Sequence, residues 1–237
     1  MELKIKTIIL AGGLGTRISE ETVDKPKPMV LIDDKPMLWH IMHIYGIQGF
    51  TDFVIAGGYK MHIIEEWVSH LKTSWNIQVL DTGQDDQTGS RIIKTMTHIG
   101  NEKCFVTYGD GLGNIDLKKL LQFHVSGSAT LTLTAVRPPS RFGVIQSENG
   151  LITHFGEKNQ ADAGWINGGF FVVEPEISKL DFNRNTSFEA DIIPKLVAKR
   201  KVNAFHHKGF WQPMDTLREK QILKEISKKR VPDWLIL

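Results

Sequence analysis

Residues 5–17 of the chain read Ile-Lys-Thr-Ile-Ile-Leu-Ala-Gly-Gly-Leu-Gly-Thr-Arg. The apolar, β-branched start of this stretch is typical of a buried strand, and it leads directly into three glycines. Glycines after a strand let backbone amides approach phosphate oxygens, and a following helix start favours negative charge. Lys27 follows ten residues after Arg17 and lies between two prolines. The stretch therefore predicts a strand that ends in a phosphate-binding loop.

Other interpretations of this loop fit the residues less well. A Walker A loop requires lysine and then serine or threonine after its last glycine, but Thr16 and Arg17 follow Gly15 here. A dinucleotide-binding loop requires a third glycine where this chain has Ile18. A plain turn from strand to helix needs neither three glycines nor two nearby cations. We expect instead a loop that wraps a nucleoside triphosphate, with Arg17 and Lys27 providing fixed positive charge at its phosphates.

The rest of the chain alternates short β-branched runs with helical patterns. In the first half we expect strands at 6–10, 52–56, 77–80 and 104–108, and helices at 37–45, 63–71 and 115–124. In the second half we expect strands at 130–136, 169–173 and 202–206, a hairpin of 143–145 with 151–155, and helices at 188–195 and 216–226.

This order predicts an α/β fold with a Rossmann-like, mostly parallel mixed sheet flanked by helices. The order of strands and helices expected in the second half predicts a small α+β excursion from that sheet. The chain shows no repeat, linker or low-complexity segment, so we interpret residues 1–237 as one domain. Within it, 1–126 form a nucleotide-binding half and 127–237 an acceptor-binding half.

Composition excludes several classes of function. Apolar residues make up 41% of the 237 residues, and the formal net charge is only +2, without the clustered basic excess of a nucleic-acid binder. No apolar run is long enough to span a membrane, and the glycine loop interrupts the early one, which argues against a signal peptide. The single cysteine, Cys104, cannot form an internal disulfide and fits a reducing compartment. We therefore expect a cytoplasmic protein.

Several motifs carry a family resemblance over nearly the whole chain. They are Leu-Ala-Gly-Gly-Leu-Gly-Thr-Arg at 10–17, Lys-Pro-Lys-Pro-Met at 25–29, Thr-Tyr-Gly-Asp-Gly at 107–111, Arg-Phe-Gly at 141–143, Ile-Asn-Gly-Gly-Phe-Phe-Val at 166–172 and Gly-Phe-Trp-Gln-Pro-Met-Asp-Thr-Leu-Arg at 209–218. The chain resembles the sugar-phosphate nucleotidyltransferases, and the run at 209–218 is typical of the glucose-1-phosphate cytidylyltransferase branch. The resemblance implies the nucleotide-diphospho-sugar transferase fold.

The resemblance implies a reaction between two anions. An oxygen of a sugar 1-phosphate attacks the α-phosphorus of a nucleoside triphosphate, and pyrophosphate leaves. Charge neutralisation and in-line geometry must then supply most of the catalysis. By resemblance Arg17 and Lys27 are the catalytic cations, and Lys27 matches the family better than Lys25 because it lies eight residues before Lys35-Pro36.

The resemblance also implies a Mg²⁺ site formed by Asp110 and Asp215. Asp110 lies between glycines just after an expected strand, where a parallel sheet opens its ligand crevice. Mg²⁺ prefers oxygen ligands, commonly one or two carboxylates with phosphates and waters. Considered alone, Asp215 could equally be the N-cap of the last helix.

Nucleotide binding is implied for the glycine loop and for a polar stretch at 81–91. The base would be contacted near Thr88, Gly89 and Arg91, although a polar surface loop is the alternative, and Ser90 stands where the family more often has glycine. The implied nucleotide-binding residues are Leu10, Ala11, Gly12, Gly13, Leu14, Gly15, Thr16, Thr88, Gly89, Arg91 and Gly109.

The implied acceptor-binding residues are Glu157, Lys158, Asn167 and Gly168. Two departures concern this half of the site. Asn159 replaces a family proline, and the stretch between Lys60 and Asp81 is shorter than in the cytidylyltransferase branch.

We therefore expect transfer of CMP from CTP to a sugar 1-phosphate, with glucose 1-phosphate as the preferred acceptor. Another phosphorylated small molecule, or uridylyl or guanylyl transfer, is the alternative. A catalytically silent nucleotide-binding subunit is a remote alternative, because the chain has the cations Arg17 and Lys27 and the carboxylates Asp110 and Asp215. The partners would be the nucleoside triphosphate, the acceptor and possible further copies of the chain in a homo-oligomer.

Overall fold

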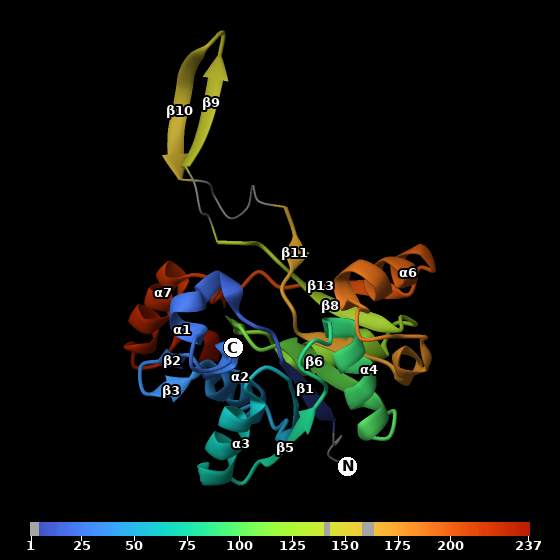
Figure 1. Cartoon of the computed structure of the whole chain (residues 1–237). Coiled ribbons are helices and arrows are strands. Elements are labelled where there is room, and N and C mark those ends of the chain that lie inside the picture. The colour runs from blue at the N-terminus through green and yellow to red at the C-terminus, as the bar shows by residue number, and fades with distance from the viewer. Residues whose placement is uncertain (1–4, 140–142, 158–163) are drawn as a thin grey trace.

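An eight-stranded mixed sheet runs through the centre of the computed structural model, which describes residues 5–139, 143–157 and 164–237 (Figure 1). Its order is β11-β8-β12-β6-β1-β4-β5, and β13 pairs with β8. The strands are β1 Lys6–Ala11, β4 Asp52–Gly57, β5 Asn76–Asp81, β6 Cys104–Tyr108, β8 Leu131–Val136, β11 Ile166–Asn167, β12 Phe171–Val173 and β13 Val202–His206.

Parallel pairing dominates the part of the sheet that the first half of the chain forms. β1 pairs in parallel with both β4 and β6, and β4 pairs in parallel with β5. β12 is antiparallel to β6 and β8, whereas β13 is parallel to β8. The expected mostly parallel mixed sheet is therefore confirmed, and strands from both halves of the chain share it. The division into two halves stays a prediction.

Helices cover both faces because the strands are apolar on both sides. Ile9 of β1 points into a core formed with α2 Met37–Gly46, α3 Met61–His70, α5 Leu117–Val125 and α7 Leu217–Ser227. Ile8 and Leu10 point into the opposite core, formed with α4 Thr88–His98 and α6 Ile193–Ala198. Figure 1 shows α2, α3 and α7 on one side of the sheet and α4 and α6 on the other.

Helix α4 is the largest element that the sequence analysis missed. From the sequence we expect a polar, base-contacting stretch at 81–91 and no helix, but the helix begins at Thr88 and buries Ile92, Ile93 and Met96 against the sheet. Ile92, Ile93 and Met96 are separated by one and three residues, which is typical of one face of a helix. This spacing was not recognised in the sequence because the residues just before it are polar.

Other boundaries shift by a few residues. The expected helix at 188–195 is a π-helical turn, Phe188–Ile192, followed by α6, with Pro194 in the first turn of α6. The expected strand at 169–173 starts only at Phe171, because Gly169 and Phe170 have positive φ angles.

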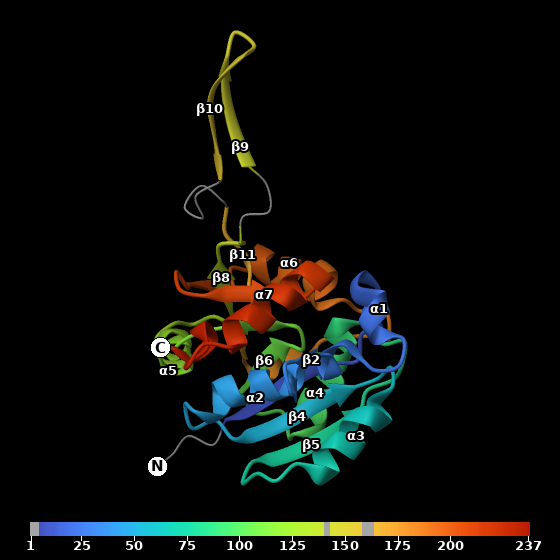
Figure 2. The same ribbon diagram turned by 90° about the vertical axis from the view of Figure 1, so that its left-hand side faces the viewer.

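The expected hairpin is confirmed as β9 Gly143–Glu148 and β10 Leu151–Glu157. Asn149 and Gly150 both have positive φ angles, as a two-residue hairpin turn requires. The hairpin extends away from the sheet (Figures 1 and 2).

Short elements complete the fold around the site. They are the strands β2 Leu31–Ile32, β3 Lys35–Pro36, β7 Gly111–Gly113 and β14 Trp211–Pro213, the helix α1 Ser19–Thr22, and the 3-10 turns Thr16–Ile18, Lys27–Met29, Pro175–Lys179 and Asp233–Leu235. Among the described residues no helix is long and apolar enough to cross a membrane.

Candidate active site

The site forms at the carboxyl edge of two neighbouring parallel strands. Leu10 near the end of β1 lies opposite Tyr108 at the end of β6, so the glycine loop and Asp110 leave the sheet side by side. Gly109 permits this approach, since a Cβ atom there would lie 2.5 Å from the carbonyl oxygen of Leu10. The sheet edge therefore places the phosphate loop against the first aspartate.

A second pair of short strands brings Asp215 to the same place. β14 pairs antiparallel with β7, so Pro213 lies opposite Gly111. The amide of Met214 donates to the carbonyl of Asp110 over 2.8 Å. Asp215 follows directly, and Thr216 rather than Asp215 is the N-cap of α7, in a capping box with Glu219. Asp215 is thus not needed as a cap.

The two cations and the two carboxylates predicted from the sequence converge. Lys27 Nζ donates to Asp110 Oδ2 over 2.7 Å and to Asp215 Oδ1 over 2.6 Å. Arg17 Nη1 donates to Asp215 Oδ2 over 2.8 Å. The Lys27 side chain is 10% exposed and that of Arg17 72% exposed. Lys27 is therefore held deep in the site, whereas Arg17 reaches it from solvent.

The prolines around Lys27 explain its fixed position. Pro26 and Pro28 flank it in a 3-10 turn, and their restricted φ angles limit the backbone. A nearly buried ammonium needs a carboxylate partner, and here it has two. The arrangement leaves one positive charge between two negative ones.

The donor set at this point fits Mg²⁺. Two carboxylate oxygens converge within hydrogen-bond reach of a single small cationic group. Mg²⁺ commonly takes one or two carboxylates and completes its shell with phosphate oxygens and water. Within the described part of the chain no group of three or more His, Cys, Asp or Glu side chains could hold a metal ion. Any metal here would therefore depend on nucleotide oxygens for the rest of its shell.

The glycine loop is open on its outer side. Leu10, Ala11 and Gly12 are buried, whereas Gly13, Leu14 and Thr16 are exposed. Gly15 has φ 67°, a left-handed conformation that favours glycine. The exposed part of the loop can therefore present backbone amides to a ligand.

Arg91 lies behind this loop and is buried. Its guanidinium donates to the hydroxyl of Thr82 and to the backbone carbonyls of Gly12, Gly57, Gly83 and Gln84. Burial lowers the pKa of Arg91. The structure thus shows Arg91 joining three loops. Its contact with a nucleotide base stays a prediction.

Thr88 and Gly89 lie at the start of α4 and contact residues 186–189 from the second half of the chain. The Thr88 hydroxyl donates to Glu189 over 2.6 Å and accepts from the Phe188 amide over 2.9 Å. A Cβ atom on Gly89 would lie 2.9 Å from the carbonyl oxygen of Thr186. The glycine therefore allows the two segments to touch.

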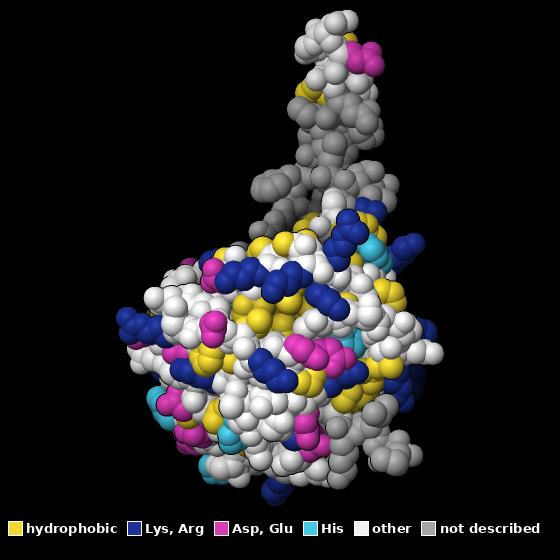
Figure 3. Space-filling view, turned by 90° about the vertical axis from the view of Figure 1, so that its right-hand side faces the viewer, with side chains coloured by type: hydrophobic (Ala, Val, Ile, Leu, Met, Phe, Trp, Pro, Cys, Tyr) yellow, Lys and Arg dark blue, Asp and Glu magenta, His cyan; other side chains and the backbone are white. Residues whose placement is uncertain are grey.

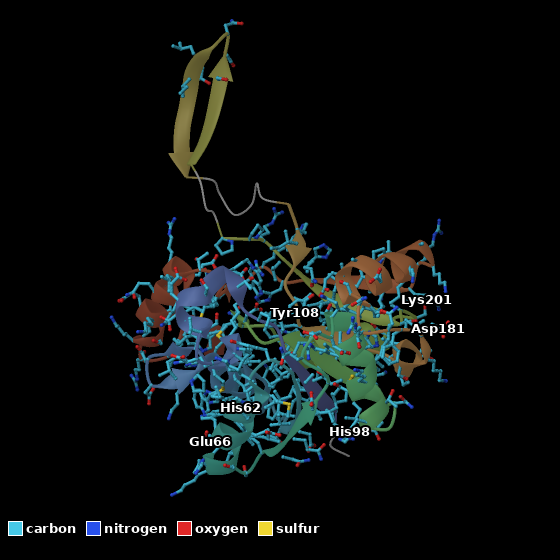
Figure 4. All side chains as sticks on the ribbon, in the orientation of Figure 1. His62, Glu66, His98, Tyr108, Asp181 and Lys201 are labelled. Atoms are coloured by element: carbon cyan, nitrogen blue, oxygen red, sulfur yellow. The ribbon has the colours of Figure 1, made fainter. Side chains whose placement is uncertain are left out.

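Asn167 and Gly168, which are predicted to bind the acceptor, lie beside the end of β6. Asn167 Nδ2 donates to the Tyr108 hydroxyl over 3.0 Å, and Trp211 Nε1 donates to the Gly168 carbonyl over 2.9 Å. Tyr108 lies near the centre of the molecule (Figure 4). Glu157 ends β10 in the projecting hairpin, and Lys158 lies outside the described residues.

Sequence reasoning missed two members of this cluster, Tyr108 and Glu189. The Tyr108 hydroxyl donates to Glu189 Oε1 over 2.6 Å. The motif Thr-Tyr-Gly-Asp-Gly placed Tyr108 two residues before Asp110, which was a usable signal. Glu189 carried no signal of its own, because it is 81 residues from its partner.

A hollow lies between residues 180–186 and α6. Its volume is about 570 Å³, and Phe182, Ile192 and Lys195 are among its lining residues. Figure 3 shows the side of the molecule that carries α6, where apolar surface lies among lysine and arginine side chains. The lining contains none of the described residues predicted for the site, although Thr186 and Ile192 lie against Gly89.

Comparison with known proteins agrees with this geometry. A protein-family model described as nucleotidyl transferase matches residues 6–219. The chain therefore belongs to the nucleotidyl transferase family.

Curated relatives narrow the resemblance. Glucose-1-phosphate cytidylyltransferase of Salmonella typhi is 40% identical, over 97% of this chain and 98% of that protein. A probable glucose-1-phosphate cytidylyltransferase of Bacillus subtilis is 38% identical, over 94% of this chain and 95% of that protein. These matches confirm the cytidylyltransferase branch indicated by the motif at 209–218.

Solved structures confirm the fold. The crystal structure of HddC from Yersinia pseudotuberculosis has a TM-score of 0.74 and 26% identity, and it covers 94% of this chain and 100% of that one. A second structure of HddC is complexed with GMP-PN. Both are similar to this chain over almost its full length.

Proposed function

We propose that the protein transfers CMP from CTP to glucose 1-phosphate, forming CDP-glucose and pyrophosphate. The main support for this proposal is the 40% identity to a glucose-1-phosphate cytidylyltransferase over 97% of the chain. The structure also brings together the four predicted site residues, Arg17, Lys27, Asp110 and Asp215. In the reaction a phosphate oxygen of the acceptor forms a bond to the α-phosphorus of CTP. The bond from that phosphorus to the bridging oxygen breaks, and the electron pair leaves with pyrophosphate.

We propose that Arg17 and Lys27 exchange partners when the nucleotide binds. In the free protein both cations are paired with Asp215. The triphosphate offers them a denser negative charge, with geometry suited to charge-assisted hydrogen bonds. Once moved, they neutralise the negative charge at the α-phosphorus and orient the leaving pyrophosphate.

The exchange leaves Asp110 and Asp215 available to hold Mg²⁺. An ion held by Asp110 and Asp215 would supply positive charge near the phosphates of the nucleotide. Asp110 directly precedes β7 and Asp215 follows β14, so the pairing of these two strands would keep both carboxylates beside the ion. Metal dependence follows from this arrangement as part of the proposal.

A substrate panel tests the proposal. CTP, UTP, GTP, ATP and dTTP are each combined with glucose 1-phosphate, mannose 1-phosphate and several other phosphorylated acceptors, and pyrophosphate release is measured with Mg²⁺ present. We expect the pair of CTP and glucose 1-phosphate to exceed every other pair by at least about 100-fold in kcat/KM. A different best nucleotide would refute the donor, and a different best acceptor would refute glucose 1-phosphate.

Guanylyl transfer is the second candidate, because two comparisons favour it. Mannose-1-phosphate guanyltransferase of Pichia angusta is 31% identical over 90% of this chain. The HddC complex holds a guanine nucleotide. Since the glycine loop binds phosphates rather than the base, the same site could serve either nucleotide, and the panel separates the two.

A further inference from the structure

Glu189 connects the predicted base-binding segment with the predicted acceptor-binding segment. Its Oε1 atom accepts the Tyr108 hydroxyl over 2.6 Å, and its Oε2 atom accepts the Thr88 hydroxyl over 2.6 Å. The hydroxyl of Ser187 also donates to Oε2, over 3.1 Å. One exposed carboxylate at the start of the π-helical turn thus receives hydroxyls from both sides of the site.

The acceptor side of this connection fixes the orientation of Asn167. Burial and the negative charge of Glu189 raise the pKa of Tyr108, so the hydroxyl keeps its proton and donates it to Glu189. Its lone pair then accepts from Asn167 Nδ2. The amide of Gly169 can only donate, and it donates to Asn167 Oδ1 over 3.0 Å. Each end of the Asn167 amide has a defined partner, and one N–H remains available to a ligand.

On the side of the predicted base-binding segment, Glu189 fixes the start of α4. The Thr88 hydroxyl donates a hydrogen bond to Glu189 and accepts one from the amide of Phe188. Two further bonds join the same segments, from the Gln87 amide to the Arg184 carbonyl and from the Ser90 amide to the Thr186 carbonyl. The position of Thr88 and Gly89 therefore depends on the chain segment that carries Glu189.

We propose that Glu189 is a positioning residue that couples donor binding to acceptor binding. It acts through Tyr108 on Asn167 and through Thr88 on the start of α4, without touching either substrate. Hydrogen bonds to a charged group are about twice as strong as neutral ones, so a single carboxylate can hold both branches. The proposal rests on the proposed function for the identity of the two ligands.

The first test measures amide hydrogen exchange in the ligand-free protein. The reporters are the amides of Gly169 and Phe188, which donate to the side chains at the two ends of the network. We expect Glu189→Ala to accelerate exchange at both amides at least about fivefold. Tyr108→Phe should accelerate only Gly169. If Glu189→Ala left either amide unchanged, the proposed coupling would be overturned, whatever the enzyme's substrates are.

The second test is kinetic. With CTP and glucose 1-phosphate, Glu189→Ala should raise the KM for both substrates about tenfold with a much smaller change in kcat. Tyr108→Phe should raise mainly the acceptor KM and Thr88→Val mainly the CTP KM. The matched control is Glu176→Ala, which also removes an exposed carboxylate from the second half and should change neither KM. A Glu189→Ala enzyme with only one altered KM would contradict the coupling.

The two tests separate this inference from the proposed function. A substrate panel that identified a different nucleotide or acceptor would replace the proposed function, while the exchange pattern would still decide the role of Glu189. Conversely, normal exchange and normal KM values in Glu189→Ala with active wild-type enzyme would remove only the coupling.

Discussion

Lys27 Nζ lies 2.6 Å from Asp215 Oδ1, although 188 residues separate them in the chain. The same ammonium lies 2.7 Å from Asp110 Oδ2. One lysine therefore occupies the space between the two carboxylates that the family resemblance assigns to Mg²⁺. The cation that would contact the triphosphate and the ligands that would hold the metal are paired with each other in the ligand-free protein.

Removing this ammonium should abolish most of the turnover. We expect Lys27→Met to lower kcat/KM by a factor of about 10²–10³, since a charge-assisted contact to a developing charge contributes that much. The control is Lys25→Met, two residues away and half-buried, which should retain near-normal kcat/KM. An equal loss of kcat/KM in the two variants would show that a disturbed loop, and not the missing Lys27 charge, lowers turnover.

The same variant should bind a divalent cation more tightly in the absence of nucleotide. Without Lys27, Asp110 and Asp215 repel each other and no ammonium competes for them. We expect Mn²⁺ to bind free Lys27→Met at least about tenfold more tightly than free wild type, by electron paramagnetic resonance titration. Unchanged affinity would mean that Lys27 does not compete with the metal.

Neutralising either carboxylate should impair metal binding as well as turnover. Asp110→Asn and Asp215→Asn nearly preserve side-chain shape but remove a negative charge. We expect each to weaken Mn²⁺ binding in the presence of nucleotide at least about tenfold, and chelation of metal to stop turnover in wild type. Full activity in wild type after chelation would contradict the metal site.

Replacing Arg91 should destabilise the fold. Arg91→Met removes five hydrogen bonds, four to backbone carbonyls and one to the Thr82 hydroxyl. We expect the free energy of unfolding in urea to fall by about 3 kcal/mol or more. Lys94→Met, on the same helix but more exposed, should cost about 1 kcal/mol or less. Unchanged stability with lost CTP affinity would instead make Arg91 a nucleotide contact.

Acid should destabilise the protein through His40. Burial lowers the pKa of His40 to about 4, and the neutral ring lies 3.3 Å from the Ile32 carbonyl. Between pH 6.5 and 4 the unfolded chain binds a proton that the folded protein does not, so the free energy of unfolding falls as the pH drops. The loss across this window is about 3 kcal/mol.

Urea unfolding at several pH values checks this contribution. His40→Asn should flatten the decline between pH 6.5 and 4, whereas His98→Asn, at an exposed position on α4, should leave it unchanged. An identical decline in His40→Asn and wild type would assign the acid sensitivity to other groups. His43, His124 and His207 are the next candidates, since burial lowers the pKa of each.

The sequence by itself determined the sheet and most of the site. Apolar runs predicted β1, β4 and β6, because buried parallel strands are nearly continuous in apolar residues. The edge strand β5 was predicted from a shorter run, Ile77 to Leu80, which is only half-buried in the sheet. The glycine loop, Arg17, Lys27, Asp110 and Asp215 could be named from local motifs. These features are encoded in stretches of a few residues, which is why they are visible without a structure.

Only the tertiary structure decided which of these residues meet. The pairing of β14 with β7 brings Asp215 to Asp110, and no local pattern specifies that register. The contact of Arg91 with the base stays a prediction, and no sequence pattern indicated that three separate loops supply hydrogen-bond acceptors for its guanidinium. Glu189 reaches Tyr108 across 81 residues. Such contacts depend on how distant segments pack, and a hydrogen bond between distant side chains leaves no periodicity in the sequence.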